Sequence, residues 1–314
     1  MMLNLNTECE GWFSLSAFKQ DKDGHEIAGS RRPLGAVFHN LITNGGLDQM
    51  GTSGAWLRWC QVGSGTADAA FTDTGLVSRV AGSTTKATSS GVQATAPYYT
   101  WVRNVYRFAA GVAAGNLSEV GISWLSTGSM FSRARIVDGA GAPTTITVLA
   151  DEFLDVTYEF RKYLPAADAT GTIVLEGVTQ TWTARAANAT LTSARGVFGW
   201  EILENGTSEG SFSLNSSGRV AYAGSIGAIT STPTGTAQLT GTGSVATYVA
   251  GDYYSDITFS YALDAGNFPS PGITAFMFKM GIGTFQFGFS PGILKTSSKV
   301  LSLTFRHSWS RKTL

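Results

Sequence analysis

Apolar and polar residues alternate with a period of two along much of the chain. The run from Trp12 to Phe18 alternates in this way, and so does the run 155–161. In the second run Val156, Tyr158 and Phe160 fall on one face of an extended chain. No segment keeps apolar residues at helical spacing over four turns. The pattern therefore predicts an all-β protein of short strands separated by turns.

One segment departs from this pattern and predicts a short helix near the N-terminus. Thr43 or Asn44 can cap its first turn, and Gly51 can end it after about two turns. A tight turn is predicted at residues 20–24, because Asp-Gly accepts the positive φ angles of a hairpin turn. Further strands are predicted by apolar and aromatic runs at 57–63, 98–108, 116–124, 130–137, 144–149, 173–176 and 179–185.

The strands divide into two groups. Residues 164–171 are predicted to be a linker, which separates a β-rich domain at 1–165 from a second at 166–314. Short strands with turns between them are typical of β-sandwiches, so we expect two sandwich-like domains. Similar strings at 155–160, 256–261 and 301–306 are either traces of a repeat or coincidence. The Gly/Thr-rich stretch 224–243 is either a long loop or exposed strands, and its role stays open.

Composition narrows the function. Charged residues make up 14% of the chain, against about 25% in a typical soluble protein, and the net charge is zero. Without a basic patch we expect no nucleic-acid partner. No apolar run approaches the length of a membrane-spanning helix, so we expect no membrane insertion. No secretory leader is recognised, and Cys9 and Cys60 lie among apolar residues, which predicts two buried thiols in a protein made in a reducing cytosol.

Catalytic patterns are weak. Residues 206–210 match Gly-x-Ser-x-Gly, but the following sequence predicts a strand where a nucleophile elbow needs a helix. Asp151, Glu152 and Asp155 form an acidic group that suits either a polar turn or glycoside hydrolysis. The three histidines are scattered singly. We therefore expect no metal, no cofactor and no enzymatic activity.

Aromatic residues are the most suggestive group for binding. They serve core packing, subunit interfaces or stacking on sugar rings. The apolar run 276–289 is predicted to be buried, because an exposed strand of this composition would aggregate. The candidate ligand or interface aromatics are Tyr98, Tyr99, Trp101, Tyr253, Tyr254 and Trp309.

An ordered series of segments resembles the tail-fibre and tail structural proteins of tailed bacteriophages. It opens with Phe-His-Asn-Leu-Ile-Thr-Asn-Gly-Gly-Leu-Asp at 38–48 and covers about residues 37–165. The residues from 285 to 311 are similar to the end of such proteins. The segments of the series that follow its opening are 60–66, 72–76, 115–121, 131–136 and 143–159.

The resemblance implies a structural part of a virion tail, made in the host cytoplasm. It implies contacts with other tail proteins, a homotrimer or ring, and a contribution to host attachment as a fibre, fibre-attachment or baseplate protein. It carries no catalytic residues. Two alternatives stay open: a receptor-binding module that recognises a host surface glycan, and a capsule-degrading enzyme that uses the acidic group at 151–155. A glycan-binding module would need a solvent-facing aromatic cluster, which we expect in the second half.

Overall fold

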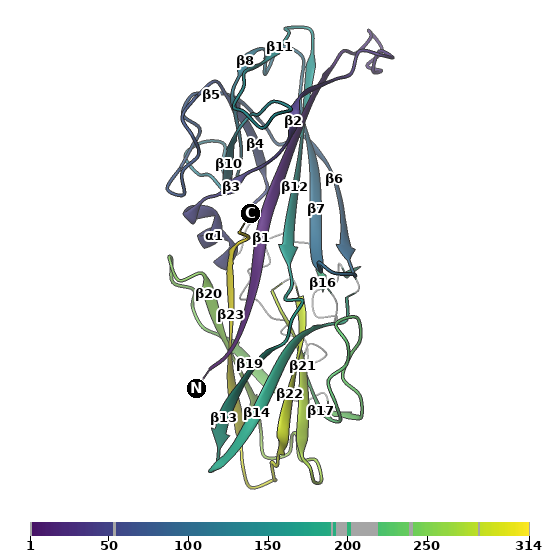
Figure 1. Cartoon of the computed structure of the whole chain (residues 1–314), viewed down its shortest axis with the longest axis vertical. Coiled ribbons are helices and arrows are strands. Elements are labelled where there is room, and N and C mark those ends of the chain that lie inside the picture. Colours follow the sequence, from purple (N-terminus) through teal and green to yellow (C-terminus); the bar gives the residue numbers. More distant parts are fainter. Residues whose placement is uncertain are drawn as a thin grey trace.

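The computed structural model describes residues 2–52, 55–189, 191–192, 200–201, 219–238, 241–281 and 283–313. Strands make up 55% of the protein and helix 3%, in several sheets with one helix. This confirms the prediction of an all-β fold with sandwich-like packing. Figure 1 shows an elongated molecule in which two β-rich halves are stacked along the long axis.

One long sheet runs through both halves. Its strand order is β19-β20-β23-β1-β12-β7-β6, and β2 also pairs with β1. The strands are β1 (Met2–Phe18), β2 (Arg32–His39), β6 (Lys86–Gln93), β7 (Tyr99–Phe108), β12 (Phe153–Tyr163), β19 (Thr242–Val245), β20 (Tyr254–Tyr261) and β23 (Leu301–Arg311).

Strand β1 links the two halves because it changes partners along its length. Its segment Glu8–Phe18 pairs antiparallel with β12 in the first half. Its segment Met2–Cys9 pairs parallel with β23 in the second half. In Figure 1, β1 rises from the N-terminus in the lower half to the top of the molecule.

A second sheet faces the long sheet in each half. In the first half its order is β3-β10-β9-β4-β5, and in the second half it is β13-β14-β22-β21-β17-β18. Two small pairs, β8 with β11 and β15 with β16, complete the sheets. The remaining strands are β3 (Leu41–Ile42), β4 (Trp59–Gly63), β5 (Arg79–Ser83), β8 (Gly115–Leu117), β9 (Glu119–Ser123), β10 (Ser132–Arg135), β11 (Ile146–Val148), β13 (Ala169–Leu175), β14 (Val178–Ala187), β15 (Leu191–Thr192), β16 (Trp200–Glu201), β17 (Arg219–Ala223), β18 (Thr236–Gln238), β21 (Ile273–Met280) and β22 (Gly283–Ile293).

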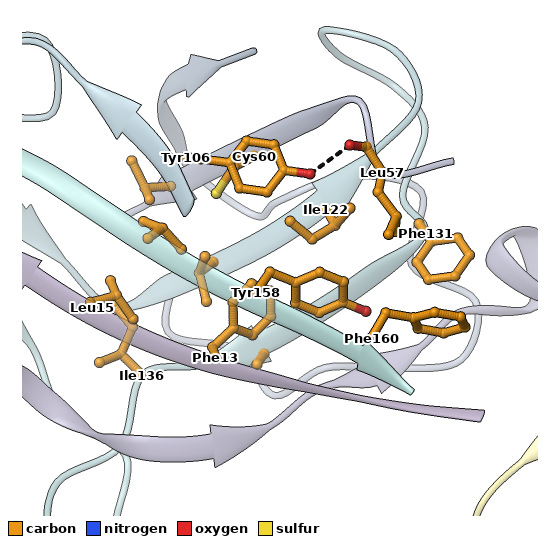
Figure 2. Close-up of a cluster of buried hydrophobic side chains, with 14 of the residues drawn as sticks. Phe13, Leu15, Leu57, Cys60, Tyr106, Ile122, Phe131, Ile136, Tyr158 and Phe160 are labelled. Atoms are coloured by element: carbon orange, nitrogen blue, oxygen red, sulfur yellow. Dashed lines mark hydrogen bonds between the residues drawn. The ribbon is translucent and has the colours of Figure 1, made fainter. Parts of the chain in front are cut away.

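Each half has its own apolar core. Figure 2 shows part of the first core, where Phe13, Tyr158 and Phe160 of the long sheet meet residues of the facing sheet. The buried Tyr106 hydroxyl donates a hydrogen bond of 2.6 Å to the carbonyl of Leu57, so its polar group is satisfied. The second core is rich in phenylalanine, contributed largely by β20, β21, β22 and β23.

The chain passes from the first core to the second between Phe160 and Leu164, close to the boundary predicted at residue 165. The terminal strands cross this boundary. Leu3 and Leu5 of β1 lie in the second core, while Trp309 of β23 lies in the first. The two halves therefore share strands as well as an interface.

Three local predictions, about the helix, the cysteines and the apolar run, are confirmed. Helix α1 (Asn44–Gly51) begins after Thr43, whose hydroxyl accepts a hydrogen bond from the amide of Gly46. Both cysteines are buried. Strands β21 and β22 place the apolar run from residue 276 to 289 inside the second half. In the described residues no helix is long and apolar enough to cross a membrane.

The linker prediction is wrong for part of its range. Leu164 is buried in the second core, and β13 already begins at Ala169. Gly171, the last residue of the predicted linker, pairs in register with Trp182, whose indole occupies the space that a side chain at Gly171 would need. The stretch at 224–243, whose structure the sequence left open, contains β18 and the start of β19.

Candidate functional site

The outer face of the long sheet in the first half carries a group of aromatic and arginine side chains. Successive side chains of a strand point to opposite faces, so the residues between the core positions of β12 point outward. Glu159 and Arg161 of β12 alternate in this way with buried Tyr158 and Phe160. We call the group the aromatic–arginine face. Its residues are Trp12, Tyr99, Trp101, Arg103, Glu159, Arg161 and Tyr163.

Guanidinium groups lie against the rings of this face. The Arg161 guanidinium carbon lies 5.1 Å from the centre of the Tyr99 ring and 5.5 Å from the ring of Trp12. Arg103 lies 5.2 Å from the ring of Trp101. Each such cation–π contact contributes about 0.5–1 kcal/mol when it is exposed. The contacts therefore hold long side chains in defined positions on the outer face of the sheet.

Two buried carboxylates fix the arginines and the rings. Glu159 accepts hydrogen bonds from Arg103 Nε at 2.8 Å and from Arg161 Nε at 2.7 Å. Glu10 accepts one from Trp12 Nε1 at 3.2 Å and another from the Tyr163 hydroxyl. A carboxylate accepts several hydrogen bonds at once, so each anchors two side chains.

Tyr163 donates to Glu10 throughout the neutral pH range. Burial raises its pKa to about 12, and the hydrogen bond to the Glu10 carboxylate acts in the same direction. Its ring also lies 5.1 Å from the ring of Tyr99. The phenol therefore stays protonated and works as a fixed support for the face.

Trp101 lies over a glycine of the neighbouring strand. Gly91 of β6 pairs in register with Trp101, and a Cβ atom at Gly91 would come within 2.6 Å of the indole. The missing side chain lets the ring pack close to the sheet. Trp101 is half-buried and remains accessible at the surface.

The six predicted aromatics do not form one cluster. Only Tyr99 and Trp101 belong to the aromatic–arginine face. Tyr98 packs beside the second core and Tyr253 beside the first. Tyr254 lies on the second half, with the Arg306 guanidinium 3.4 Å from its ring centre. The expected aromatic cluster thus lies in the first half.

The prediction that Trp309 contacts a ligand is wrong, because its side chain is not available at the surface. Its side chain is 2% exposed, and Nε1 donates a hydrogen bond of 2.9 Å to the Leu47 carbonyl. It is buried because β23 continues past the second half and lays its end against α1. The sequence prediction also missed Trp12, Arg103 and Arg161. Their outward position in the alternating pattern of neighbouring strands is the feature that could have identified them.

The acidic group at 151–155 forms ion pairs with basic side chains. Asp155 accepts from Arg107 at 2.8 Å and from Arg31 at 3.1 Å. Glu152 pairs with Arg32 at 2.6 Å. Asp151 pairs with Lys19 at 2.7 Å. Each carboxylate thus serves the structure. In the described residues no group of three His, Cys, Asp or Glu could hold a metal, and the Gly-x-Ser-x-Gly pattern at 206–210 lies outside them.

These pairs predict a loss of stability in acid. The hydrogen bonds from Arg32 lower the pKa of Glu152 below its ordinary value, and the Leu149 amide acts in the same direction. A lowered folded-state pKa stabilises the protein above the unfolded-state pKa of about 4.3, and this contribution disappears as the pH falls through the folded-state value. We expect Glu152→Gln to lower the urea midpoint at pH 6. Below pH 4 the midpoint of the variant should approach that of the parent protein. A constant difference from pH 3 to 7 would contradict this.

The aromatic–arginine face is suited to binding. It combines planar rings, fixed cations and satisfied carboxylates, and Trp, Tyr and Arg are the residues enriched where binding energy concentrates. It offers stacking and charge-assisted hydrogen bonds to a partner. No family model, no curated protein and no solved structure matches this chain.

Proposed function

We propose that this chain is a structural component of a bacteriophage tail, as a fibre, fibre-attachment or baseplate protein that contributes to assembly and host attachment. The observation that carries the proposal is the ordered series of segments over residues 37–165, which resembles tail proteins of phages. In the fold these segments contribute α1, β4, β9, β10, β11 and β12, which surround one core. An ordered series that contributes strands to one shared core is more specific than scattered strings.

The architecture agrees with a role in an assembly. Strands β1 and β23 run through both halves and pair with each other, so the halves are held in a fixed relation along an elongated body (Figure 1). The chain has zero net charge, so it has little electrostatic repulsion to keep copies apart. The aromatic–arginine face has the composition of an interface centre. We infer that a second copy of the chain covers this face.

Mass spectrometry and antibody labelling of purified particles test the main proposal directly. We expect the chain in the particle at a fixed copy number, with label on the tail. Light scattering of the purified protein should give a trimer or a larger ring. A stable monomer that is absent from particles would overturn the proposal.

The role of the face is tested by Trp101→Ala. If a second copy covers the ring, the variant should weaken self-association by about tenfold or more, because a central tryptophan contributes about 2 kcal/mol or more at an interface. Analytical ultracentrifugation measures the change. Tyr254→Ala is the matched control, because this ring also has an arginine against it but lies on the other half. If both variants weaken self-association equally, or if neither weakens it, the inferred interface is contradicted.

A second candidate function is supported by the same ring. Trp101 is half-buried on the outer face of the long sheet, and accessible aromatic rings stack on sugars. In a receptor-binding module, Trp101→Ala would abolish binding to host cells and to their surface polysaccharide while the oligomer stays intact. If Trp101→Ala loses both the oligomer and the binding to host cells, the structural role is favoured. Full binding by an intact oligomer excludes the face as a glycan site.

A further inference from the structure

The N-terminal part of β1 has a neighbouring strand on only one of its two edges. On one edge β23 pairs with Met2–Cys9, and β2 continues the line above it. On the other edge β12 pairs with β1 down to Glu8, where it ends with Tyr163. In Figure 1, β12 stops near the middle of the molecule while β1 continues to the N-terminus. Among the described strands none pairs with residues 2–7 on this side, and we call this segment the open edge.

The backbone of Asn4 and Asn6 faces the open edge. In a strand the N–H and C=O groups of successive residues point to alternate edges. The carbonyl of Cys9 points toward the β23 side, because it accepts a hydrogen bond of 2.9 Å from the amide of Lys312. The pairing of β1 with β23 runs without a shift, so the alternation holds along this part of the strand. The even-numbered residues therefore direct backbone donors and acceptors to the side where no described strand meets them.

The open edge lacks the features that usually protect an edge strand from pairing. Native edges are blunted by lysine, proline, a bulge or short length. Two other edge strands of the long sheet have such features: β2 begins with Arg32-Pro33 and pairs through a register shift, and β19 has four residues. Residues 2–7 read Met-Leu-Asn-Leu-Asn-Thr, without a charge, a proline or a glycine. We therefore expect this edge to be covered by a further strand.

Space for a further strand is present where β12 ends. A pocket of about 260 Å³ lies beside Leu5, Asn6 and Glu8, and residues 163–165 form its other wall. Leu164 is buried in the second core, so the chain leaves the line of β12 at this point and continues as β13 in the facing sheet. A strand beside the open edge would extend the line that β12 leaves.

We propose that a second copy of this chain covers the open edge with its own open edge, as an antiparallel pair of β1 strands around a two-fold axis. The segment is self-complementary. Leu3 and Leu5 are buried in the second core, while Asn4 and Asn6 are exposed on the outer face. Antiparallel pairing around Asn4 sets leucine opposite leucine and asparagine opposite asparagine, and no like charges meet. Two-fold contacts between identical surfaces are the commonest form of self-association.

The end of β12 fixes the register of this pair. A shift by one residue would turn the leucines of the second copy toward solvent. A shift by two would set Met2 of the second copy opposite Glu8, whose edge is already occupied by Tyr163. With Asn4 opposite Asn4, the pair extends to Met2 opposite Asn6 at both ends. These are hydrogen-bonded pairs, which exchange both of their backbone N–H···O bonds, so the groups that face the open edge are satisfied.

Sedimentation equilibrium of the full chain tests the proposal. The contact adds to the one inferred at the aromatic–arginine face, so we expect an even number of copies. Asn4→Pro should weaken the pairing by about tenfold or more, because proline removes the N–H at the centre of the pair in both copies. That N–H has no partner in its own sheet, so the far-UV circular dichroism should not change. Asn4→Ala is the matched control, because it keeps the amide and should pair like the parent protein.

A charge exchange at the same position tests the two-fold register. Asn4→Lys and Asn4→Asp should each lose the pairing at low salt, since like charges meet at the axis. An equimolar mixture of the two variants should pair again. Added salt should weaken the mixed pair and partly restore the pairing of each single variant.

Four results would overturn the proposal: parent affinity in Asn4→Pro, equal loss in Asn4→Ala, a mixture of charged variants that stays unpaired, or a parent protein with an odd number of copies. A monomeric parent whose Asn4→Pro variant fails to enter particles would identify another tail protein as the occupant and overturn it as well. The proposed role in a tail is judged separately. A trimer found in particles and unaffected by Asn4→Pro supports that role while it contradicts the paired β1 strands.

Discussion

Glu119→Ala should lower the free energy of unfolding by about 3–5 kcal/mol, which is the usual cost of breaking one side of a buried ion pair. Glu119 and Arg133 are almost fully buried, and Arg133 Nε donates to the Glu119 carboxylate at 2.9 Å. Without Glu119 a buried guanidinium loses its nearest anion. Asp73 remains at 2.7 Å, which limits the loss to the stated range.

The same carboxylate also anchors a long loop. It accepts hydrogen bonds from the backbone amides of Gly65 at 3.0 Å, Val77 at 3.1 Å and Ser78 at 2.8 Å. Removing it leaves these donors without their acceptor at the two ends of the loop 64–78. We therefore expect faster proteolysis within this loop under native conditions.

Urea denaturation and limited proteolysis measure both effects. Glu176→Ala is the control, because Glu176 pairs with Lys299 at 2.5 Å on the exposed surface, where such a pair contributes about 0–1 kcal/mol. A loss in Glu119→Ala no larger than in the control would show that the buried pair is not an important support. An unchanged proteolysis pattern would show that the loop holds without it.

Much of the local structure was predictable from the sequence because it depends on neighbouring residues. The alternation at 155–161 predicted β12, and the capping pattern predicted α1 from Thr43 to Gly51. The role of Arg133 was not predictable in the same way. An arginine at an inward position becomes favourable only through Glu119, which the register of β9 against β10 brings close.

The candidate surface was predicted in part for the same reason. Tyr99 and Trp101 are close in the sequence, whereas Trp12 and Arg161 reach the same surface only through the pairing of β1 with β12 and of β12 with β7. Trp309 shows the opposite error. Its aromatic character suggested a ligand, but its depth depends on β23 passing beyond its own half, a topological fact that the local sequence does not contain.

That passage of β23 underlies the last prediction, that Phe305→Ala destabilises both halves together. Phe305 is buried, and its ring centre lies 4.7 Å from those of Phe278 and Phe287 and 5.4 Å from that of Phe259. Truncating such a residue costs about 3–5 kcal/mol, because transfer energy is lost and a cavity remains. The expected loss is among the largest in the second core.

The loss should not stay in the second core, because the halves share strands. Four residues after Phe305, β23 places Trp309 in the first core, and β1 places Leu3 and Leu5 in the second. A second half that unfolds alone would have to pull Trp309 out of its packing with Tyr248, 5.6 Å away between ring centres. We therefore expect Phe305→Ala to unfold in one calorimetric transition, shifted to lower temperature, with the tryptophan signal changing in the same step. Val174→Ala, at an exposed position of β13, should leave that transition in place. Two transitions, with the upper one at the parent temperature, would show instead that the halves are independent and that β1 and β23 join them without coupling their stability.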